Sequence, residues 1–393
     1  MKTTHGAIKK KLLAKGVVMP SPESVYVADD VNVDRISGHG VTVFPGCRIT
    51  GKNTLILPGV RIGHEAPVTL ENCLLGKNVR LNGGFFQKAV LLGDNVVGSN
   101  AHVRAGTILE EQACAAHTVG LKQTLLFPFV TLGSLINFCD CFMAGGTSRK
   151  DHSEVGSSFV HFNYTPNQDK ATPSMMGNVH QGVMLDQAPI FLGGQGGLVG
   201  PVRIGFGCLT GAGSIVRKDE ERCNRMILAG HTRSMSLPRR TGVHPGAVRI
   251  FNHNIKYMAA LAALYAWYVH VRPVFTDGPL SRELIRGLQE ILVQSIRERI
   301  RQLEKFCDTL GSSQARDQIL TTMEMVGPQM DQVLTLSDLS ASAEHLILWL
   351  NKRATQYDKD YITAIQQLPS DLKTLGSGWL LEIETSLLDR LTV

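Results

Sequence analysis

The chain of 393 residues lacks the long apolar run that a membrane-spanning helix needs. Its most apolar stretch, at 257–269, is only about 13 residues long and is typical of a buried helix. The amino terminus has a basic cluster but no secretory signal, so we expect a cytoplasmic protein. Eight cysteines occur without a C-x-x-C pair or framework spacing, which indicates reduced thiols. No adequate ligand cluster is present, so no metal site is predicted.

Glycine is scarce in the last third of the chain. Of the 39 glycines, 33 lie in residues 1–246 and only 6 in residues 247–393. Charge divides at the same point, because residues 247–393 carry a net charge of −2 within a total of +6. We therefore predict a helical lead-in at 1–25, a glycine-rich domain at 26–246 and an α-helical domain at 247–393. The remaining positive charge lies in the glycine-rich part, which is therefore the part expected to attract anions.

Aliphatic residues recur every six positions in the glycine-rich part. Leu192, Leu198 and Ile204 are one such series, and small residues follow many of its members. This hexapeptide period predicts a mainly β fold, a parallel β-helix in which three short strands make each coil of about eighteen residues. The period is interrupted at about 143–182, where a polar insertion should leave the coil.

After Gly246 the apolar spacing becomes helical. We expect one helix at 255–271, another that starts at Pro279, and further helices at 313–326, 338–367 and 377–391. These helices carry no motif of their own, so their expected role is protein interaction or capping of an oligomer.

Two cations stand one predicted coil apart, since Arg104 and Lys122 are separated by eighteen positions. Stacked at about 6 Å they repel by ~3 kcal/mol, and a bound phosphate would relieve that repulsion. Two plainer interpretations remain open. Both side chains are solvated, or Asp140 in the following coil neutralises them.

Four segments carry a resemblance to a known family: VRAG (103–106), FNYTPNQDK (162–170), LVGPVRIG (198–205) and GAGSIVRKD (211–219). They are similar to the left-handed β-helical acetyltransferase domain of the bifunctional N-acetylglucosamine-1-phosphate uridyltransferase/glucosamine-1-phosphate acetyltransferase family. The resemblance implies a left-handed coil, acetyl-CoA or another acyl-CoA as co-substrate, a sugar phosphate or nucleotide sugar such as UDP-N-acetylglucosamine as substrate, and a homotrimer. Residues 1–40 lack the family's phosphate loop, so we expect no uridyltransferase activity.

The resemblance also assigns residues. It implies that Arg104 and Lys122 bind the sugar phosphate, that Asn163, Tyr164 and Lys170 contact the sugar, and that Gly194 and Ala212 line the acyl-CoA groove between subunits. The glycine-rich stretch at 193–197 could supply backbone N–H groups to a tetrahedral oxyanion.

The chain departs from the family where the catalytic base should stand. The family's histidine aligns with Ser134, and a lone serine cannot accept the amine proton. His152, helped by Glu154, and His161 are the candidate replacements. The plainer interpretations are an exposed loop histidine for His152 and a buried, hydrogen-bonded side chain for His161.

Two functions therefore remain open at this point. The first is an acyl-CoA-dependent acyltransferase that acts on a sugar phosphate or nucleotide sugar. The second is a non-catalytic scaffold that binds such a ligand and has lost the histidine. Nucleic-acid binding is disfavoured because the basic clusters are short and have no interleaved aromatics.

Overall fold

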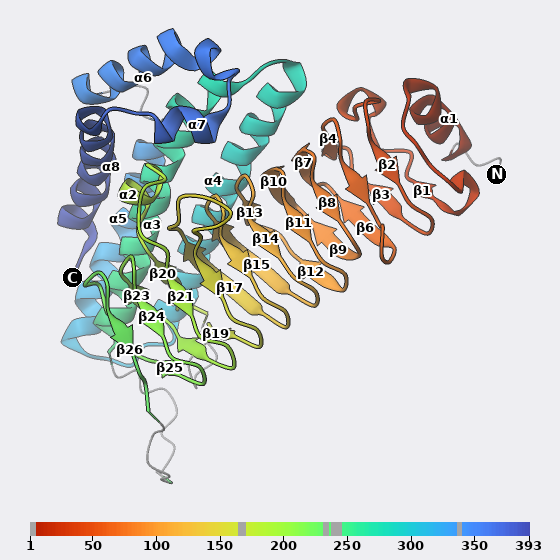
Figure 1. The fold of residues 1–393 in the computed structure, drawn as a ribbon. Coiled ribbons are helices and arrows are strands. Elements are labelled where there is room, and N and C mark those ends of the chain that lie inside the picture. Colours follow the sequence, from red (N-terminus) through yellow and green to blue (C-terminus); the bar gives the residue numbers. More distant parts are fainter. Residues whose placement is uncertain (1–4, 164–169, 231–235, 237–245, 336–339) are drawn as a thin grey trace.

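The computed structural model describes residues 5–163, 170–230, 236, 246–335 and 340–393. The chain begins with α1 (His5–Lys15) and the short helices η1 (Pro22–Ser24) and η2 (Val33–Arg35), and then winds into a long coil of parallel strands (Figure 1). One side of this coil, which we call face A, is a ten-stranded parallel sheet. Its strands are β2 (Thr42–Val43), β5 (Arg61–Ile62), β8 (Arg80–Leu81), β11 (Val96–Val97), β14 (Cys114–Ala115), β16 (Thr131–Leu132), β18 (Glu154–Val155), β21 (Phe191–Leu192), β24 (Leu209–Thr210) and β26 (Met226–Ile227).

The other two sides belong to one sixteen-stranded sheet that bends around a corner. Face B contains β1 (Tyr26–Val27), β3 (Arg48–Thr50), β6 (Val68–Glu71), β9 (Gly84–Gln87), β12 (Ala101–Val103), β19 (Val160–Phe162), β22 (Gly197–Val199) and β25 (Ile215–Val216). Face C contains β4 (Leu55–Ile56), β7 (Leu74–Lys77), β10 (Ala89–Gly93), β13 (Thr107–Leu109), β20 (Ser174–Met176) and β23 (Arg203–Ile204). The long strands β15 (Gly120–Leu126) and β17 (Asn137–Met143) run through the corner, because β15 pairs with both β12 and β13.

The aliphatic members of the hexapeptide series fill the interior of the coil. Leu192, Leu198 and Ile204 are each at most 2% exposed, and the strands that carry them pair in parallel with the neighbouring coils. The predicted parallel β-helix followed by helices is thereby confirmed. Its left-handedness was implied only by the resemblance and stays a prediction.

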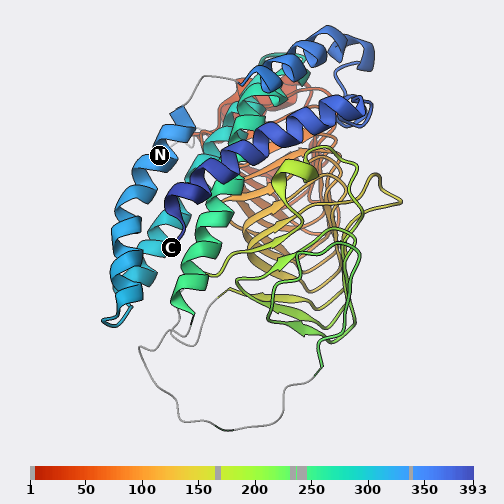
Figure 2. The same ribbon diagram turned by 90° about the vertical axis from the view of Figure 1, so that its left-hand side faces the viewer.

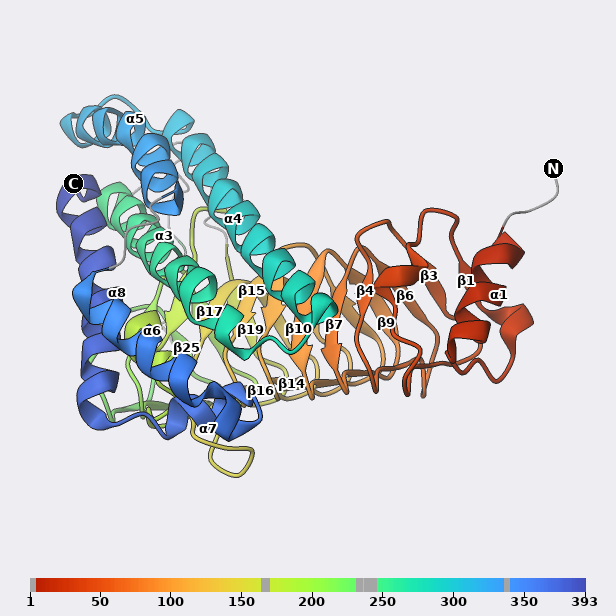
Figure 3. The ribbon, with the colours of Figure 1, turned by 90° about the horizontal axis from the view of Figure 1, so that it is seen from above.

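The helices after Gly246 lie along one side of the coil (Figure 2). They are α3 (Ala247–His270), η3 (Arg272–Phe275), α4 (Pro279–Asp308), α5 (Gln314–Thr335), α6 (Ala341–Arg353), η4 (Ala354–Tyr357), α7 (Tyr361–Gln366) and α8 (Ser370–Leu391), and the short α2 (Val179–Gly182) leaves the coil to pack against α8 and α3. Seen from above, α4 runs obliquely over face C, where it packs on β7 and β10 (Figure 3). The backbone of α4 approaches the Leu74 side chain closely there, since a Cβ atom at Gly287 would lie 2.4 Å from a methyl group of Leu74.

Helix boundaries differ from the sequence prediction in four places, one of which is the start of α8 at Ser370 instead of 377. The single helix expected at 338–367 is wrong, because α6, η4 and α7 replace it and the left-handed backbone of Asp358 (φ 47°) and Lys359 (φ 57°) separates the last two. The helix α5 continues through Pro328 to Thr335, and α3 begins at Ala247 instead of 255. The start at Pro279 is confirmed, with the proline in the first turn, where its missing N–H has no helical partner to lose.

A buried charged cluster joins the coil to the helices. Arg272 of η3 is 2% exposed and donates from Nη2 to both carboxylate oxygens of Glu111, each at 2.8 Å. The second carboxylate, Glu110, lies 3.8 Å from Arg272 and accepts a 2.5 Å hydrogen bond from the hydroxyl of Tyr268. The guanidinium also stacks 3.7 Å above the ring centroid of Tyr361. One cation thus serves two carboxylates, which leaves an excess negative charge in the interface.

That excess charge makes the interface sensitive to pH. Burial first, and then the neighbouring Glu111, raise the pKa of Glu110 to about 7, although Arg272 and Tyr268 oppose the rise. The folded chain therefore holds the Glu110 proton more tightly than the unfolded chain. This stabilisation is fully present below pH 4.5, the ordinary pKa of the group, and is lost as the pH rises through about 7.

We predict that Glu110→Gln removes this pH dependence. The wild type should lose on the order of 2 kcal/mol of unfolding free energy between pH 5 and pH 8 through this group, whereas the glutamine variant should not. Urea denaturation at both pH values, followed by tryptophan fluorescence, measures the difference, because Trp267, Trp349 and Trp379 all lie in the helices. Equal pH dependence in the two proteins would contradict the assignment of the excess charge to Glu110.

Candidate functional site

A cavity of about 510 Å³ lies at the corner between faces B and C, under the C-terminal half of α4. The coil contributes cationic and polar side chains and α4 contributes three further residues. The lining residues are Arg104, Lys122, Gln123, Asn137, Cys139, Asp140, Val160, His161, Phe162, Asn163, Lys170, Glu298, Arg299 and Gln302. The cavity thus brings together five of the predicted site residues: Arg104, Lys122, His161, Asn163 and Lys170. Tyr164 lies outside the described residues.

The two stacked cations occupy the corner itself. Val103 pairs with Leu121 in the adjacent coil, and the N–H of Arg104 donates to the carbonyl of Leu121 at 2.8 Å, so the predicted stacking of Arg104 on Lys122 is confirmed. The guanidinium of Arg104 donates from Nη2 to Cys139 Sγ at 3.6 Å, while its buried Nε has no partner among the described residues. Within the described ranges neither cation forms an ion pair, so the positive charge faces the cavity.

Asp140 does not neutralise these cations as the alternative interpretation supposed. The coil is one residue shorter at this point, so Lys122 pairs with Cys139, and Asp140 turns the corner with a left-handed φ of 59°. Its carboxylate is 5% exposed and accepts hydrogen bonds from Arg299 Nη2 at 2.8 Å and from Asn163 Nδ2 at 2.6 Å. The negative charge of Asp140 is therefore paired with Arg299 inside the wall of the cavity.

His161 is held by hydrogen bonds at both ring nitrogens. Its Nδ1 lies 2.6 Å from the carbonyl oxygen of Cys139, which can only accept, so Nδ1 carries the proton and Nε2 accepts from the hydroxyl of Ser174 at 2.8 Å. Burial lowers the pKa of His161 to about 4. In this arrangement the imidazole has no lone pair free for an incoming amine proton. The geometry matches the plainer interpretation of this residue, a hydrogen-bonded side chain inside the coil.

The other candidate base, His152, lies away from the cavity. It follows β17 in the loop that leads back to face A, and the Glu154 beside it begins β18 on that face, in register with Thr131. The ring nitrogen Nε2 of His152 lies 3.8 Å from the Glu154 carboxylate, so these two groups do meet. Neither residue lines the cavity, because the loop at 144–153 leaves the coil from the corner between faces C and A. The structure thus separates His152 and Glu154 from Arg104 and Lys122.

The residues assigned to the acyl-CoA groove lie at the corner between faces A and B. Gly194 and Ala212 occupy adjacent coils, and the N–H of Gly213 donates to the carbonyl of Gly194 at 2.9 Å. Ala212 is exposed and Ser134 is partly exposed at the same corner. Within 193–197, the N–H groups of Gly193, Gln195 and Gly197 already bond to neighbouring coils, which reduces the stretch's capacity to hold an oxyanion.

Sequence reasoning missed the contribution of α4. Arg299 is 3% exposed and lies in the cavity wall, with Glu298 and Gln302 beside it. A signal was present, because Arg299 stands three and four positions from the buried Ile296 and Leu303, on the apolar stripe of the predicted helix. A charged residue on such a stripe indicates a buried partner elsewhere in the chain.

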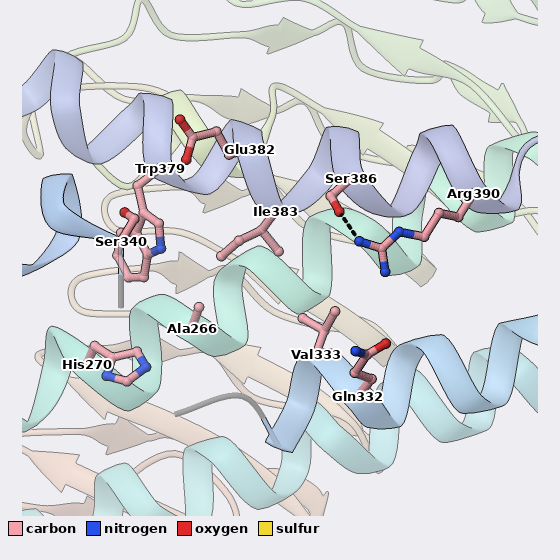
Figure 4. Close-up of a pocket in the computed structure, with 10 residues that line it drawn as sticks. All are labelled: Ala266, His270, Gln332, Val333, Ser340, Trp379, Glu382, Ile383, Ser386 and Arg390. Carbon is pink, nitrogen blue, oxygen red and sulfur yellow. Dashed lines mark hydrogen bonds between the residues drawn. The ribbon is translucent and has the colours of Figure 1, made fainter. Parts of the chain in front are cut away.

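A second cavity of about 270 Å³ lies within the helices, between α3, α5 and α8. Figure 4 shows Trp379 and Ile383 of α8 facing Ala266 of α3 and Val333 of α5, with the Arg390 guanidinium bonded to Ser386 at one end. None of the site residues predicted from the sequence lines it. Within the described ranges, no cluster of three or more histidine, cysteine or acidic side chains is placed to hold a metal, and no helix has the length and apolarity to cross a membrane.

The fold places the chain among proteins built on a parallel β-helix of hexapeptide repeats. Within that class, the bifunctional protein GlmU of Thermotoga maritima is 28% identical over 211 residues, which cover 53% of this chain and 42% of that protein. GlmU of Lawsonia intracellularis is 27% identical over 230 residues, 58% of this chain and 45% of that protein. The chain thus matches less than half the length of these curated relatives. They confirm the predicted resemblance to a hexapeptide-repeat acyltransferase of the GlmU type.

A structure of LpxA from Acinetobacter baumannii aligns over 52% of this chain and 66% of that chain, with 14% identity and a TM-score of 0.20. No family model matches the chain.

Proposed function

We propose that this protein is an acyl-CoA-dependent acyltransferase that binds a sugar phosphate or nucleotide sugar in the cavity at the corner of faces B and C. The observation that carries the proposal is the stacked pair Arg104 and Lys122, which faces the cavity with no carboxylate paired to it among the described residues. A phosphate accepts charge-assisted hydrogen bonds from both side chains. Asn163 and Lys170 lie beside them in the same wall, where they would contact the sugar.

The remaining parts of the proposal rest on the GlmU resemblance. Acetyl-CoA or another acyl-CoA is the donor, with Gly194 and Ala212 along its groove in a cytoplasmic homotrimer. An amine or hydroxyl of the sugar attacks the thioester carbonyl and CoA leaves as its thiolate, while a base takes the proton of the attacking group and returns it to that thiolate. His152 and Glu154 remain the proposed source of that base, and they would have to reach a sugar that extends from the cavity or belongs to a neighbouring subunit.

A second candidate is favoured by the state of His161. Because both of its ring nitrogens are engaged and the family's histidine position holds Ser134, the described residues that line the cavity include no free imidazole. A scaffold that binds a sugar phosphate without transferring an acyl group fits this arrangement. The two functions differ in whether acyl-CoA binds and is consumed.

Calorimetric titration with glucosamine 1-phosphate, UDP-N-acetylglucosamine and acetyl-CoA separates the two candidates. We predict that Arg104→Ala weakens binding of the phosphate ligand about 10- to 100-fold, the loss of one charge-assisted contact. Arg80→Ala is the control, because Arg80 is exposed on face A and should leave the affinity unchanged. Release of CoA thiol in the presence of the sugar would establish the transferase. Sugar binding without binding or consumption of acetyl-CoA would leave only the scaffold, and an affinity independent of Arg104 would overturn the cavity as the anion site.

A further inference from the structure

Arg299 is a buried cation that the packing of α4 does not explain. It projects from the apolar stripe of the helix and is 3% exposed, with Ile296 and Leu303 fully buried one turn away on either side. Burial of a charge is unfavourable before its partners are counted, and an apolar residue of similar volume commonly packs as stably. The reason for burying this guanidinium must therefore lie in the groups to which it donates hydrogen bonds.

Arg299 contacts Lys170 directly and Asn163 through Asp140. Its Nη1 donates to the backbone carbonyl of Lys170 at 2.8 Å, and its Nη2 donates to Asp140 Oδ1 at 2.8 Å. The other oxygen of Asp140 accepts from Asn163 Nδ2 at 2.6 Å. One side chain of α4 is thus connected to Asn163 through a carboxylate and to Lys170 directly.

A residue of α3 contacts the backbone one position after Lys170. Asn254 is fully buried, and its Nδ2 donates to the carbonyl of Ala171 at 2.7 Å. Two helices from the C-terminal part of the chain therefore hold the successive carbonyls of Lys170 and Ala171. These contacts join residues that are far apart in the sequence, and they exist only when the helices lie on the coil.

The same ion pair preserves the charge of the anion site. Asp140 immediately follows Cys139, the register partner of Lys122, and its carboxylate would lower the positive charge of the cavity if it were unpaired. Arg299 occupies that carboxylate, so Arg104 and Lys122 remain available to a phosphate. Asn163 and Lys170 are at the same time kept in the wall beside the phosphate position.

We propose that Arg299 is a positioning residue for substrate recognition, through which the helical part of the same chain sets the preference for a sugar phosphate over simple phosphate. This inference rests on the proposed function for the identity of the ligand. Arg104 and Lys122 supply the affinity for phosphate itself. Arg299 acts one step away, through Asp140 on Asn163 and through the carbonyl of Lys170.

The test is the double variant Asp140→Asn/Arg299→Met, which removes both buried charges together so that neither is left unpaired. Titration with inorganic phosphate and with glucosamine 1-phosphate gives the two dissociation constants. We expect the constant for phosphate to stay within about threefold of wild type, while the sugar phosphate binds about tenfold more weakly, the effect of losing one or two positioning hydrogen bonds. Arg299→Lys should give an intermediate loss, because the ammonium keeps the charge but not the fork that reaches both partners.

The matched control is Arg297→Met, which removes an exposed arginine two positions away on the same helix and should change neither constant. Urea denaturation followed by tryptophan fluorescence shows whether the helices of the double variant remain folded, and a variant with intact helices that keeps its sugar preference overturns this inference. The proposed function is overturned instead if the wild-type protein binds neither ligand, or if Arg104→Ala leaves both affinities unchanged.

Discussion

Arg272→Met should lower the free energy of unfolding of the helical part by about 3–5 kcal/mol, because it leaves two carboxylates without their shared cation. Glu110 is 2% exposed and the side chain of Glu111 is 22% exposed, so water cannot fully replace the guanidinium. The substitution also removes the cation stacked 3.7 Å above the Tyr361 ring. Tyr361 in turn accepts a hydrogen bond from Trp267 Nε1 at 3.0 Å, so the loss should reach α3 as well as α7.

Urea denaturation at pH 7.5, followed by tryptophan fluorescence, measures this loss. Arg286→Ala is the matched control, because Arg286 is 63% exposed and its ion pairs with Glu283 and Glu290 lie on the helix surface, where such pairs contribute little. The triple variant Glu110→Gln/Glu111→Gln/Arg272→Met should recover most of the stability, since it removes the carboxylates along with the cation. If Arg272→Met unfolds at the same urea concentration as wild type, the charged cluster does not hold the helices to the coil.

The β-helix could be predicted because its signal is local and repeated. Each coil needs an inward aliphatic residue at the same three positions, so Leu192, Leu198 and Ile204 reveal the period without any knowledge of distant contacts. The stacking of Arg104 on Lys122 followed from the same period. The period did not predict the position of Asp140. The coil there is one residue shorter than eighteen, so Cys139 and not Asp140 stands opposite Lys122.

The rest of the site depends on where loops leave the coil and on which helices pack back onto it. The loop at 144–153, which holds His152, departs from the corner between faces C and A. No hexapeptide period specifies that corner, so the sequence could not show how far His152 lies from the cations. Arg299 meets Asp140 across more than 150 positions of sequence, and only the docking of α4 on face C makes that contact. Short-range patterns therefore predicted the stacking of the two cations, whereas the contacts of Arg299 with Asp140 and Lys170 are tertiary.

The abundance of glycine in the coil has a steric cause that one pair of variants can measure. At Gly76 in β7, an added Cβ atom would lie 1.8 Å from the carbonyl oxygen of Leu92 and 2.3 Å from its carbonyl carbon. The clash is with the backbone of the adjacent coil, which is held by the pairing of β7 with β10 and covered by α4. Neither partner can rotate away as a side chain would.

Gly76→Ala should therefore destabilise the chain by about 3 kcal/mol or more, at the upper end of overpacking effects. Gly378→Ala is the opposite case, because Gly378 lies within α8 with no atom within 4 Å of an added Cβ. There the alanine should stabilise the helix by up to about 1 kcal/mol, since it reduces the backbone entropy lost on folding. Denaturation followed by far-ultraviolet circular dichroism reports both variants, because it detects strands as well as helices. Similar stabilities for the two variants would show that the coils can separate to admit a methyl group, and the close stacking would then not be what requires glycine at this position.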